Sequence, residues 1–423
     1  MIKDIVFFEK KKFSNIKKKF KLEFFCEPVV LIPLVLVLVS SLLIHSVQRQ
    51  SFQSDSLSHL TTGIAGYFLA LLISYIPLSR IKNYILPVYL LTIISLILVY
   101  FFGISMYGAQ RWLSLGLVTF QPSEVAKLAT ILALASVLDR KDIHSIRNLI
   151  IPFLVVLIPW VLIFFQPDLG TSLVLIFLFF TMIYWVQTPI EWILIIVFSA
   201  ITAWLSFLMP NLLFLWIPFI GFLAYKSFRK KTICSLFSML LHIIVSQITP
   251  ILWEIGLKDY QKDRLILFLD PSRDPLGGGY HLLQSKIAVG SGGLIGTGFL
   301  NGKLTNLQFI PEQHTDFIFS ALGEEVGFIG SFITVFLFFA LITQLITISK
   351  NARSDFESLV VIGVASILLF QIIVNIFMTI GLGPVTGIPL PFMSYGRTAL
   401  LINFVCIGMV LSTLKRCRSL RKK

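Results

Sequence analysis

Long apolar stretches separated by short polar connections run along almost the whole chain. A helix needs about 20 consecutive, mainly apolar residues to cross a bilayer. Twelve stretches approach that length, near residues 29–47, 57–77, 84–102, 119–138, 149–165, 169–186, 192–209, 211–225, 232–253, 317–348, 358–379 and 396–413. The pattern predicts an all-α, polytopic integral membrane protein, a helical bundle of about twelve transmembrane helices.

The composition agrees with a membrane protein. Of 423 residues, 56% are hydrophobic and 13% are charged, and the mean hydropathy is +0.89. This balance excludes a soluble globular protein. The net charge of +14 would suggest nucleic acid in a soluble chain, but the basic residues here lie at helix ends, so we expect no nucleic acid partner. Because no CxxC spacing occurs, four cysteines are expected to be free thiols: Cys26, Cys234, Cys406 and Cys417.

The basic residues also predict the orientation of the chain. They cluster in segment 1–28, in 226–231 and in the tail 414–423, and an even number of spans places all three clusters on the cytoplasmic side. The transmembrane domain is therefore 29–413, with both termini cytoplasmic. Segment 1–28 shows no cleavable signal, and two interpretations of it stay open: an interfacial amphipathic helix or a basic anchor.

One connection, residues 254–316, is far too long for a simple hairpin. The even parity places it on the outer side, as a large loop before the tenth span. Its apolar content and its glycines at 277–279 and 290–298 favour an ordered, partly re-entrant cap. The run at 290–296 lacks the GxGxxG spacing, so it does not indicate a dinucleotide site. We find no inverted internal repeat of the kind that marks many transporters.

Polar residues within apolar sequence concentrate at the outer ends of the spans, and intramembrane charges usually mark a site. A turn is expected at 108–112, and Pro122 is well placed to begin an inward-running helix. On that helix Glu124 and Lys127 share one face. They form either a structural ion bridge or, with Arg111 and the helix N-terminus, a place for a phosphate-bearing ligand.

Two aspartates precede other spans. Asp168 is placed to cap the helix that follows it. Asp316 is either a first-turn carboxylate or, beside an apolar wall, a base for proton abstraction, with Glu312 and His314 as near neighbours.

Other polar groups carry weaker signals. Either of Glu324 and Glu325 could be purely structural, and at least one should face a polar partner. His281 and His314 are too few and too far apart to specify a metal site, although the outer carboxylates could recruit a divalent cation together with a diphosphate. Serine-hydrolase elbows and P-loops are absent from the sequence.

Six ordered blocks carry a family resemblance. They are GAQRWLSLG from Gly108, QPSEVAKLA from Gln121, QPDLGTSLV from Gln166, DYQKDRLILFLDPSRDPLGGGYHLLQSKIAVGSGGLIGTG from Asp259, PEQHTDFIFSALGEEVGFIG from Pro311 and GPVTGIPLPFMSYG from Gly383. The blocks resemble the SEDS proteins (shape, elongation, division and sporulation), which are peptidoglycan glycosyltransferases. The GAQRW and VTGIPLPF motifs are more similar to the rod-shape-determining RodA branch than to the division-specific FtsW branch.

The resemblance implies an enzyme that polymerises lipid II into glycan strands for cell elongation and rod shape. The reaction would occur on the outer face of the bacterial cytoplasmic (inner) membrane. Asp316 matches the essential aspartate of the family's extracellular loop and is the expected catalytic residue, while Glu124 and Lys127 match a conserved-motif ion pair near it. The matched blocks also supply further expected substrate-binding residues: Arg111, Gln121, Ser123, Asp168, Arg264, Gln313, His314, Ser394 and Arg397.

The resemblance further implies partners, and the chain departs from the family pattern in two places. We expect a class B penicillin-binding transpeptidase, the MreC and MreD elongation proteins, membrane lipids, no required cofactor, and an optional divalent cation, magnesium or manganese. The chain has room for an extra helical pair near 192–253 beside a ten-span core. After the Ser-Tyr of the last outer loop the family commonly has Gly-Gly-Ser, whereas this chain has Gly396-Arg397-Thr398. Arg397 therefore either contacts the diphosphate or snorkels.

Two other functions compete with an enzyme. A flippase for the lipid-linked precursor would bind the same anionic ligand, but it should show polar residues along a route to the cytoplasm. A non-catalytic scaffold of the cell-wall machinery would tolerate loss of Asp316. The concentration of polar residues at the outer ends favours the enzyme.

Overall fold

The computed structural model describes residues 27–421 apart from 50–53, 107–108, 115–118, 140–145, 229–230, 257–258, 271–273, 275–277, 308 and 311. Each of the twelve predicted stretches contains a helix. They are α2 (Pro28–Val47), α3 (Ser56–Ile73), α5 (Ile85–Phe102), α6 (Pro122–Leu138), α7 (Ile146–Phe165), α8 (Leu169–Trp185), α9 (Ile190–Leu208), α10 (Leu213–Ser227), α11 (Lys231–Ile251), α15 (Ile318–Lys350), α16 (Asp355–Ile380) and α17 (Arg397–Arg421). The predicted helical membrane bundle is confirmed.

Short helical pieces extend some of these helices. They are α4 (Leu78–Ile81) and η2 (Lys82–Tyr84) before α5, η3 (Pro210–Leu212) before α10, and the π-helix η4 (Leu252–Gly256) after α11. Among the described residues, nine helices are long and apolar enough to span a membrane. The remaining three, α6, α8 and α10, have 17, 17 and 15 residues. Residues 1–26 of the predicted segment 1–28, with Cys26, lie outside the described residues. Cys234 and Cys406 are free thiols, as expected.

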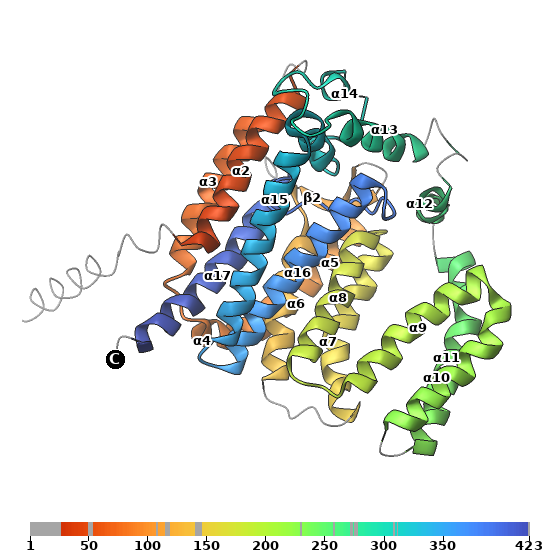
Figure 1. The fold of residues 1–423 in the computed structure, drawn as a ribbon. Helices are drawn as coiled ribbons and strands as arrows, with labels where there is room; N and C mark the ends of the chain where they lie inside the picture. Colours follow the sequence, from red (N-terminus) through yellow and green to blue (C-terminus); the bar gives the residue numbers. More distant parts are fainter. Residues whose placement is uncertain are drawn as a thin grey trace, which may run out of the picture.

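Helix α16 lies in the middle of the bundle, and it is the most buried of the candidate spans. It packs against α6, α8, α15 and α17, while α17 packs on α3 and α15 on α2 (Figure 1). Most of its buried side chains are apolar, with a few polar ones among them. Asn375, with 0% exposure, is an exception that matters for the site below.

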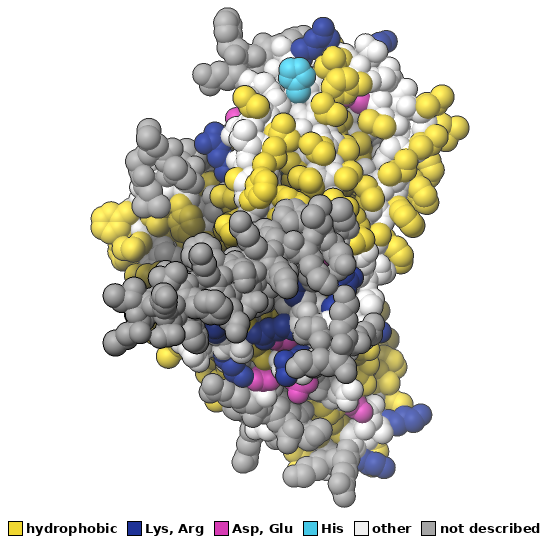
Figure 2. Space-filling view, turned by 90° about the vertical axis from the view of Figure 1, so that its left-hand side faces the viewer, with side chains coloured by type: hydrophobic (Ala, Val, Ile, Leu, Met, Phe, Trp, Pro, Cys, Tyr) yellow, Lys and Arg dark blue, Asp and Glu magenta, His cyan; other side chains and the backbone are white. Residues whose placement is uncertain are grey.

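One face of the bundle shows how hydrophobic and charged side chains separate. Hydrophobic side chains cover a broad zone in Figure 2, and charged ones gather below it. Three ion pairs join elements at the end that carries α4 and the last turns of α17: Lys82 with Asp139, Arg416 with Glu357 and Arg418 with Glu27. A charged end next to an apolar zone is typical of a bundle that spans a membrane.

Helices α9, α10 and α11 form a group of their own beside the rest of the bundle (Figure 1). They pack mainly on one another, and α9 also contacts α8. Trp216 on α10 donates a hydrogen bond of 2.9 Å from Nε1 to Oγ1 of Thr202 on α9. This group occupies the place of the predicted extra pair near 192–253; which two helices are additional to a ten-span core stays a prediction.

The structure corrects one detail: the sequence predicts a turn at 108–112, but residues 109–112 belong to a strand. Strands β1 (Ile104–Met106), β2 (Ala109–Ser114) and β3 (Thr119–Phe120) form a small antiparallel sheet in the order β1-β2-β3. Across the sheet, Trp112 lies opposite Ile104 and Leu113 opposite Phe120. Aromatic and branched side chains favour such cross-strand pairs, and they outweigh the turn signal of the preceding glycine.

The long connection contains three helices: α12 (Asp259–Leu269), α13 (Gly278–Ser291) and α14 (Lys303–Asn306). Helix α13 packs against α15 and α16, and α14 contacts α2, so this segment forms an ordered cap at one end of the bundle (Figure 1). Beneath it, Glu324 accepts hydrogen bonds from the backbone N–H groups of Leu304 (2.8 Å) and Thr305 (2.9 Å), and Glu325 accepts one from Ser46. Both glutamates therefore have polar partners, as expected for at least one.

The glycine-rich segment 292–298 inserts into a break in α15. Gly327 has φ 72° and ψ −164°, a conformation that only glycine adopts readily, and it interrupts the helix. The N–H groups of Thr297 and Gly298 donate to the carbonyls of Glu324 (2.9 Å) and Glu325 (3.0 Å). Backbone groups that the break would leave unpaired thus find partners in the cap.

We expect Gly296→Ala to destabilise the protein by about 2 kcal/mol or more. A Cβ atom at this position would lie 2.1 Å from the carbonyl oxygen of Glu325, and the residue has φ +85°. Gly290→Ala is the matched control, because nothing lies within 4 Å of its added Cβ and it sits in a helix, where alanine is favoured. Thermal unfolding of both purified variants tests this; equal melting temperatures would contradict the docked arrangement.

Candidate active site

Asp316 lies in the turn that precedes α15. Its backbone N–H donates to the carbonyl of Glu312 (3.2 Å), and its own carbonyl accepts a hydrogen bond of 2.9 Å from Nδ2 of Asn375. The N-cap of α15 is Phe317, and no side-chain cap hydrogen bond occurs there among the described residues. The carboxylate of Asp316 is therefore not used as the cap of α15, which leaves it available for chemistry.

The carboxylate of Asp316 and the guanidinium of Arg264 face the same glycine. A Cβ atom added to Gly387 would lie 3.3 Å from Oδ2 of Asp316 and 3.6 Å from Nη1 of Arg264. Arg264, on α12, also donates from Nη1 to the carbonyl of Thr386 (3.2 Å). Gly387 has φ +71°, so both the backbone shape and the close approach favour glycine here. The cap and the loop before α17 meet at Asp316.

Burial raises the pKa of Asp316 to about 6. The positive charges of Arg264 and Arg111 favour the ionised form and lower the pKa, whereas the carboxylates of Glu312 and Asp168 raise it. Burial has the largest effect. The result is a carboxylate that holds a proton well above the ordinary range of aspartate, as suits a base that must accept one near neutral pH.

Arg111 and Asp168 form a second part of the site. Nη1 of Arg111 on β2 lies 3.8 Å from Oδ1 of Asp168, and Nη2 donates to the carbonyl of Pro167. Asp168 accepts hydrogen bonds from the backbone N–H of Thr171 (3.2 Å) and from its hydroxyl (2.9 Å), which confirms the predicted helix cap. Oγ of Ser123 lies 3.5 Å from Oδ2 of Asp168. Asp168 thus caps α8 and holds Arg111 at once.

Glu124 and Lys127 form an ion pair in the first turns of α6. Nζ of Lys127 lies 2.8 Å from Oε2 of Glu124, and each residue is only 3% exposed. Pro122 begins the helix, as expected, and Gln121 is its N-cap residue. Glu124 directly follows Ser123, the residue whose hydroxyl contacts Asp168. Its predicted geometry is confirmed; its part in substrate binding stays a prediction.

The remaining predicted residues have structural contacts in the part of the chain that is described. Nε2 of Gln313 donates to Oγ1 of Thr305 (3.3 Å), and Oγ of Ser394 accepts from the backbone N–H of Leu390 (2.7 Å). The carbonyl of His314 accepts from the N–H of Tyr395 (3.0 Å). Arg397 is exposed at the first position of α17. For these four residues, substrate contact remains an expectation from the family motifs.

Two residues of the site were not predicted. His281 on α13 stacks on Phe317, with ring centroids 6.3 Å apart, and its Nδ1 atom is buried without a partner among the described residues. With Arg264 it lines a cavity of about 350 Å³. Burial lowers the pKa of His281, and the charge of Arg264 lowers it further. Asn375 could have been found as an isolated amide in an apolar span, because a buried amide there must bond to something.

No group of three or more metal-binding side chains occurs among the described residues. The charge of the Glu312 carboxylate acts on the carboxyl group of Asp316. Carboxylate oxygens of this kind can share a magnesium ion with a substrate phosphate.

Comparison with known proteins identifies the family. The profile of the FtsW/RodA/SpoVE family, described as a cell cycle protein, matches residues 21–239 and 213–419. Peptidoglycan glycosyltransferase MrdB of Escherichia coli K12 is 35% identical over 401 residues, 94% of this chain and 95% of that protein. Peptidoglycan glycosyltransferase RodA of Treponema pallidum is 32% identical, over 85% of this chain and 89% of its own length.

A solved structure agrees with these sequence matches. A chain from a peptidoglycan synthase complex that coordinates polymerization and crosslinking superposes with a TM-score of 0.71 at 26% identity, covering 92% of this chain and 97% of its own. Sequence and fold thus agree over nearly the whole length. The chain belongs to the FtsW/RodA/SpoVE family and is, like its relatives, a multi-pass membrane protein and a peptidoglycan glycosyltransferase.

Proposed function

We propose that this protein polymerises lipid II into glycan strands, with Asp316 as the catalytic residue. The observation that carries the proposal is the carboxylate of Asp316 beside the guanidinium of Arg264, under an ordered cap at one end of the bundle. Family membership supports the class of reaction. A base with a pKa raised to about 6, next to fixed positive charge, is what transfer of a sugar from a diphosphate requires.

The reaction forms one glycosidic bond and breaks one sugar–phosphate bond. An acceptor sugar hydroxyl attacks the anomeric carbon of the donor, and Asp316 takes the proton of that hydroxyl. The polyprenyl diphosphate leaves with the bonding electron pair. Arg264 and Arg111 lie where their charges reach Asp316, so they are placed to stabilise the negative charge on the leaving diphosphate.

The neighbouring groups hold this arrangement. Asp168 fixes Arg111 from the start of α8, and Asn375 binds the backbone of both Asp316 and Ile388, with the second hydrogen bond at 2.8 Å. The two loops that carry the site are thereby tied to α16, the central helix. We propose that Glu124 and Lys127 shape the diphosphate end, where the N-terminus of α6 adds positive potential.

A divalent cation, magnesium or manganese, remains part of the proposal as an optional component. Asp316 and Glu312 are the residues that would hold it, and it would lower the pKa of the acceptor hydroxyl and neutralise the diphosphate. Addition of a chelator during polymerisation tests this role.

We further propose a partner and a location. The structural match to a chain of a peptidoglycan synthase complex supports assembly with a class B penicillin-binding transpeptidase. MreC and MreD remain candidate partners from the family resemblance. The basic clusters support the bacterial inner membrane, with both termini cytoplasmic and Asp316 facing outward.

Polymerisation of purified lipid II by this protein, together with its candidate transpeptidase, tests the proposed function. A ladder of glycan chains on a gel is the expected result. Movement of lipid II across vesicles without chain formation would favour the flippase. Neither activity, with the partner bound, would favour the scaffold.

The pH dependence follows from the raised pKa of Asp316. A general base acts in its ionised form, so polymerisation should rise about tenfold per pH unit below pH 6 and level off above it. Because the charge of Glu312 raises the pKa of Asp316, Glu312→Gln should move this rise to lower pH. Initial rates of polymerisation measured between about pH 4.5 and about pH 8 test this prediction. A rise unmoved by Glu312→Gln would argue against Asp316 as the titrating group.

The proposed topology predicts thiol labelling. In a variant whose native cysteines are replaced by serine, Lys226→Cys at the end of α10 should resist a membrane-impermeant thiol reagent added from outside. Ser54→Cys, exposed just before α3, should react. The two variants control for each other in intact cells. Labelling of Lys226→Cys from outside would require the path through α9, α10 and α11 to be redrawn.

A further inference from the structure

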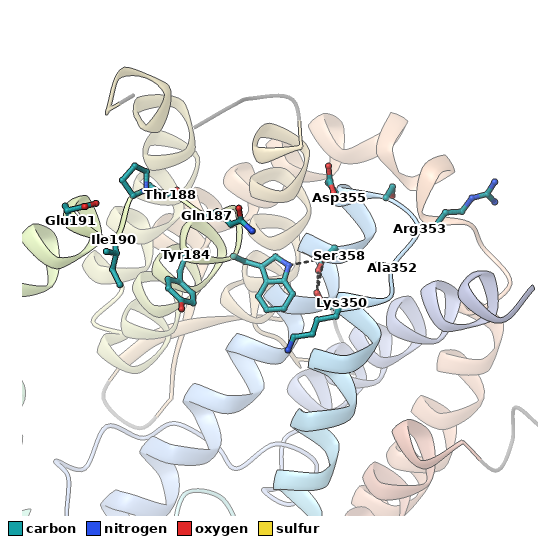
Figure 3. Close-up of a pocket in the computed structure, with 14 residues that line it drawn as sticks. Tyr184, Gln187, Thr188, Ile190, Glu191, Lys350, Ala352, Arg353, Asp355 and Ser358 are labelled. Atoms are coloured by element: carbon teal, nitrogen blue, oxygen red, sulfur yellow. Dashed lines mark hydrogen bonds between the residues drawn. The ribbon is translucent and has the colours of Figure 1, made fainter. Parts of the chain in front are cut away.

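A large cavity lies at the opposite end of the bundle from Asp316. It has a volume of about 910 Å³ and forms where the connection between α8 and α9 meets the connection between α15 and α16 (Figure 3). Helix α15 begins next to Asp316 and ends at Lys350, which lines this cavity. Residues 328–350, after the break at Gly327, correspond to about 35 Å of helix, so the cavity is separate from the proposed active site.

The walls of the cavity carry charges of both signs. Glu191 lies on the wall from α9, while Lys350 and Asp355 lie on the opposite wall (Figure 3). Arg353 extends at the rim. A ligand with only negative charge would face two carboxylates, and one with only positive charge would face two cations. A ligand that carries both a phosphate and an ammonium group matches both walls.

A buried hydroxyl without a partner points to a ligand. Thr188 lines the cavity and is only 5% exposed, and its Oγ1 atom has no hydrogen-bond partner among the described residues. Leaving a buried polar group unpaired costs free energy. The hydroxyl is covered in this structure, so the side chain must rotate before it can donate to a phosphate oxygen in the cavity.

The floor of the cavity is already held in place. Trp185 at the end of α8 donates from Nε1 to Oγ of Ser358 on α16 (2.9 Å). Ser349 at the end of α15 donates to the carbonyl of Ser358 (2.8 Å), and Ser354 caps α16 by accepting the N–H of Glu357 (3.2 Å). Three helices are thus joined at one point, so a ligand would meet a preformed site and lose little free energy in ordering it.

The surroundings favour a lipid as the source of the phosphate. Tyr184 and Ile190 line the cavity and are 60% and 52% exposed, next to helices whose apolar faces are exposed as well. An exposed tyrosine at the end of a membrane helix typically lies at the level of lipid headgroups. A headgroup in the cavity could therefore keep its acyl chains against α8 and α9.

We propose that this cavity binds the headgroup of a zwitterionic phospholipid with a primary ammonium group, such as phosphatidylethanolamine. Lys350, with Thr188, holds the phosphate, and Glu191 on the other wall holds the ammonium group. The proposal does not depend on the function of Asp316. It gives the end of the bundle remote from the active site a specific contact with the membrane.

Native mass spectrometry of the delipidated full chain tests the proposal. Phosphatidylethanolamine, phosphatidylglycerol or soluble phosphoethanolamine is added to wild type, to Lys350→Met with Thr188→Val, and to Glu191→Gln. Lys231→Met is the matched control, since Lys231 is an exposed lysine at the start of α11 and does not line the cavity. Melting temperatures confirm that each variant is folded.

We expect wild type and Lys231→Met to retain one phosphatidylethanolamine. Binding should be about tenfold weaker in the double variant and in Glu191→Gln, because each loses charge-assisted hydrogen bonds. Equal retention in folded wild type and double variant would overturn the site. Stronger retention of phosphatidylglycerol would overturn the role of the ammonium group. Binding of soluble phosphoethanolamine as tight as that of the lipid would overturn the assignment to a membrane lipid.

Discussion

Asp316→Asn should polymerise lipid II at least about a hundredfold more slowly than wild type, the usual scale for a lost acid–base group. Asparagine keeps the size of the side chain and leaves the backbone hydrogen bonds to Glu312 and Asn375 intact. It removes the charge and the basicity. The variant should therefore fold, reach the membrane and bind its partner. Its loss of activity should appear in the rate at saturating lipid II, since the carboxylate acts on the proton and not on the lipid tail.

A matched control distinguishes a loss of catalysis from a general effect of removing a carboxylate on the outer side. Asp55 lies at the start of α3 and accepts a hydrogen bond of 3.1 Å from Nε2 of Gln48. Asp55→Asn makes the same chemical change away from the site, and the amide oxygen can still accept that bond. Near-normal glycan chains from Asp316→Asn, at matched folding, would remove Asp316 from the mechanism. The scaffold and flippase interpretations would then regain support.

The helices could be predicted from the sequence because hydrophobic length alone determines them. Each stretch near the predicted positions contains a helix, including α6, whose ion pair interrupts the apolar run. The small sheet could not be predicted in this way. Its strands have three, six and two residues, and pairing between residues such as Leu113 and Phe120 depends on the partner strand and not on a local period.

The glycine-rich segment shows a different limit. The sequence indicates that 290–298 is not a nucleotide loop, but it does not indicate what the glycines do. In the structure a Cβ atom at Gly292 would lie 1.9 Å from the carbonyl oxygen of Gly323 on α15. Such contacts between segments distant in sequence leave no local pattern, although Gly292 and Gly296 are needed for the close approach.

Only part of the candidate site could be predicted from the sequence. Residues three positions apart on one helix, such as Glu124 and Lys127, lie on the same face, so their spacing in the sequence predicts their contact. The meeting of Asp316, Arg264 and Gly387 depends on how the cap folds over α16, and only the family motifs place these residues together in advance. His281 lacks any local signal, because its contact with Phe317 is likewise formed by the folded cap.

The second large effect is expected for Lys127→Ala. This change leaves Glu124 as a buried carboxylate without its ion-pair partner, and loss of one member of a buried pair typically costs about 3–5 kcal/mol. We expect a large fall in the melting temperature of the purified protein and little polymerisation. By itself, however, the single variant does not distinguish a structural pair from one that also shapes the substrate site.

Replacing both residues by apolar ones of similar size makes that distinction. Glu124→Leu with Lys127→Met removes both charges and keeps the volume, so stability should return to near the wild-type value. If the pair only stabilises α6, polymerisation per folded molecule should return as well. We expect instead that the double variant melts like wild type yet remains at least about tenfold slower, because Lys127 and the start of α6 no longer offer a full positive charge to the diphosphate. Polymerisation rates normalised to the folded fraction measure this difference, and full recovery of the rate would assign the pair to folding alone.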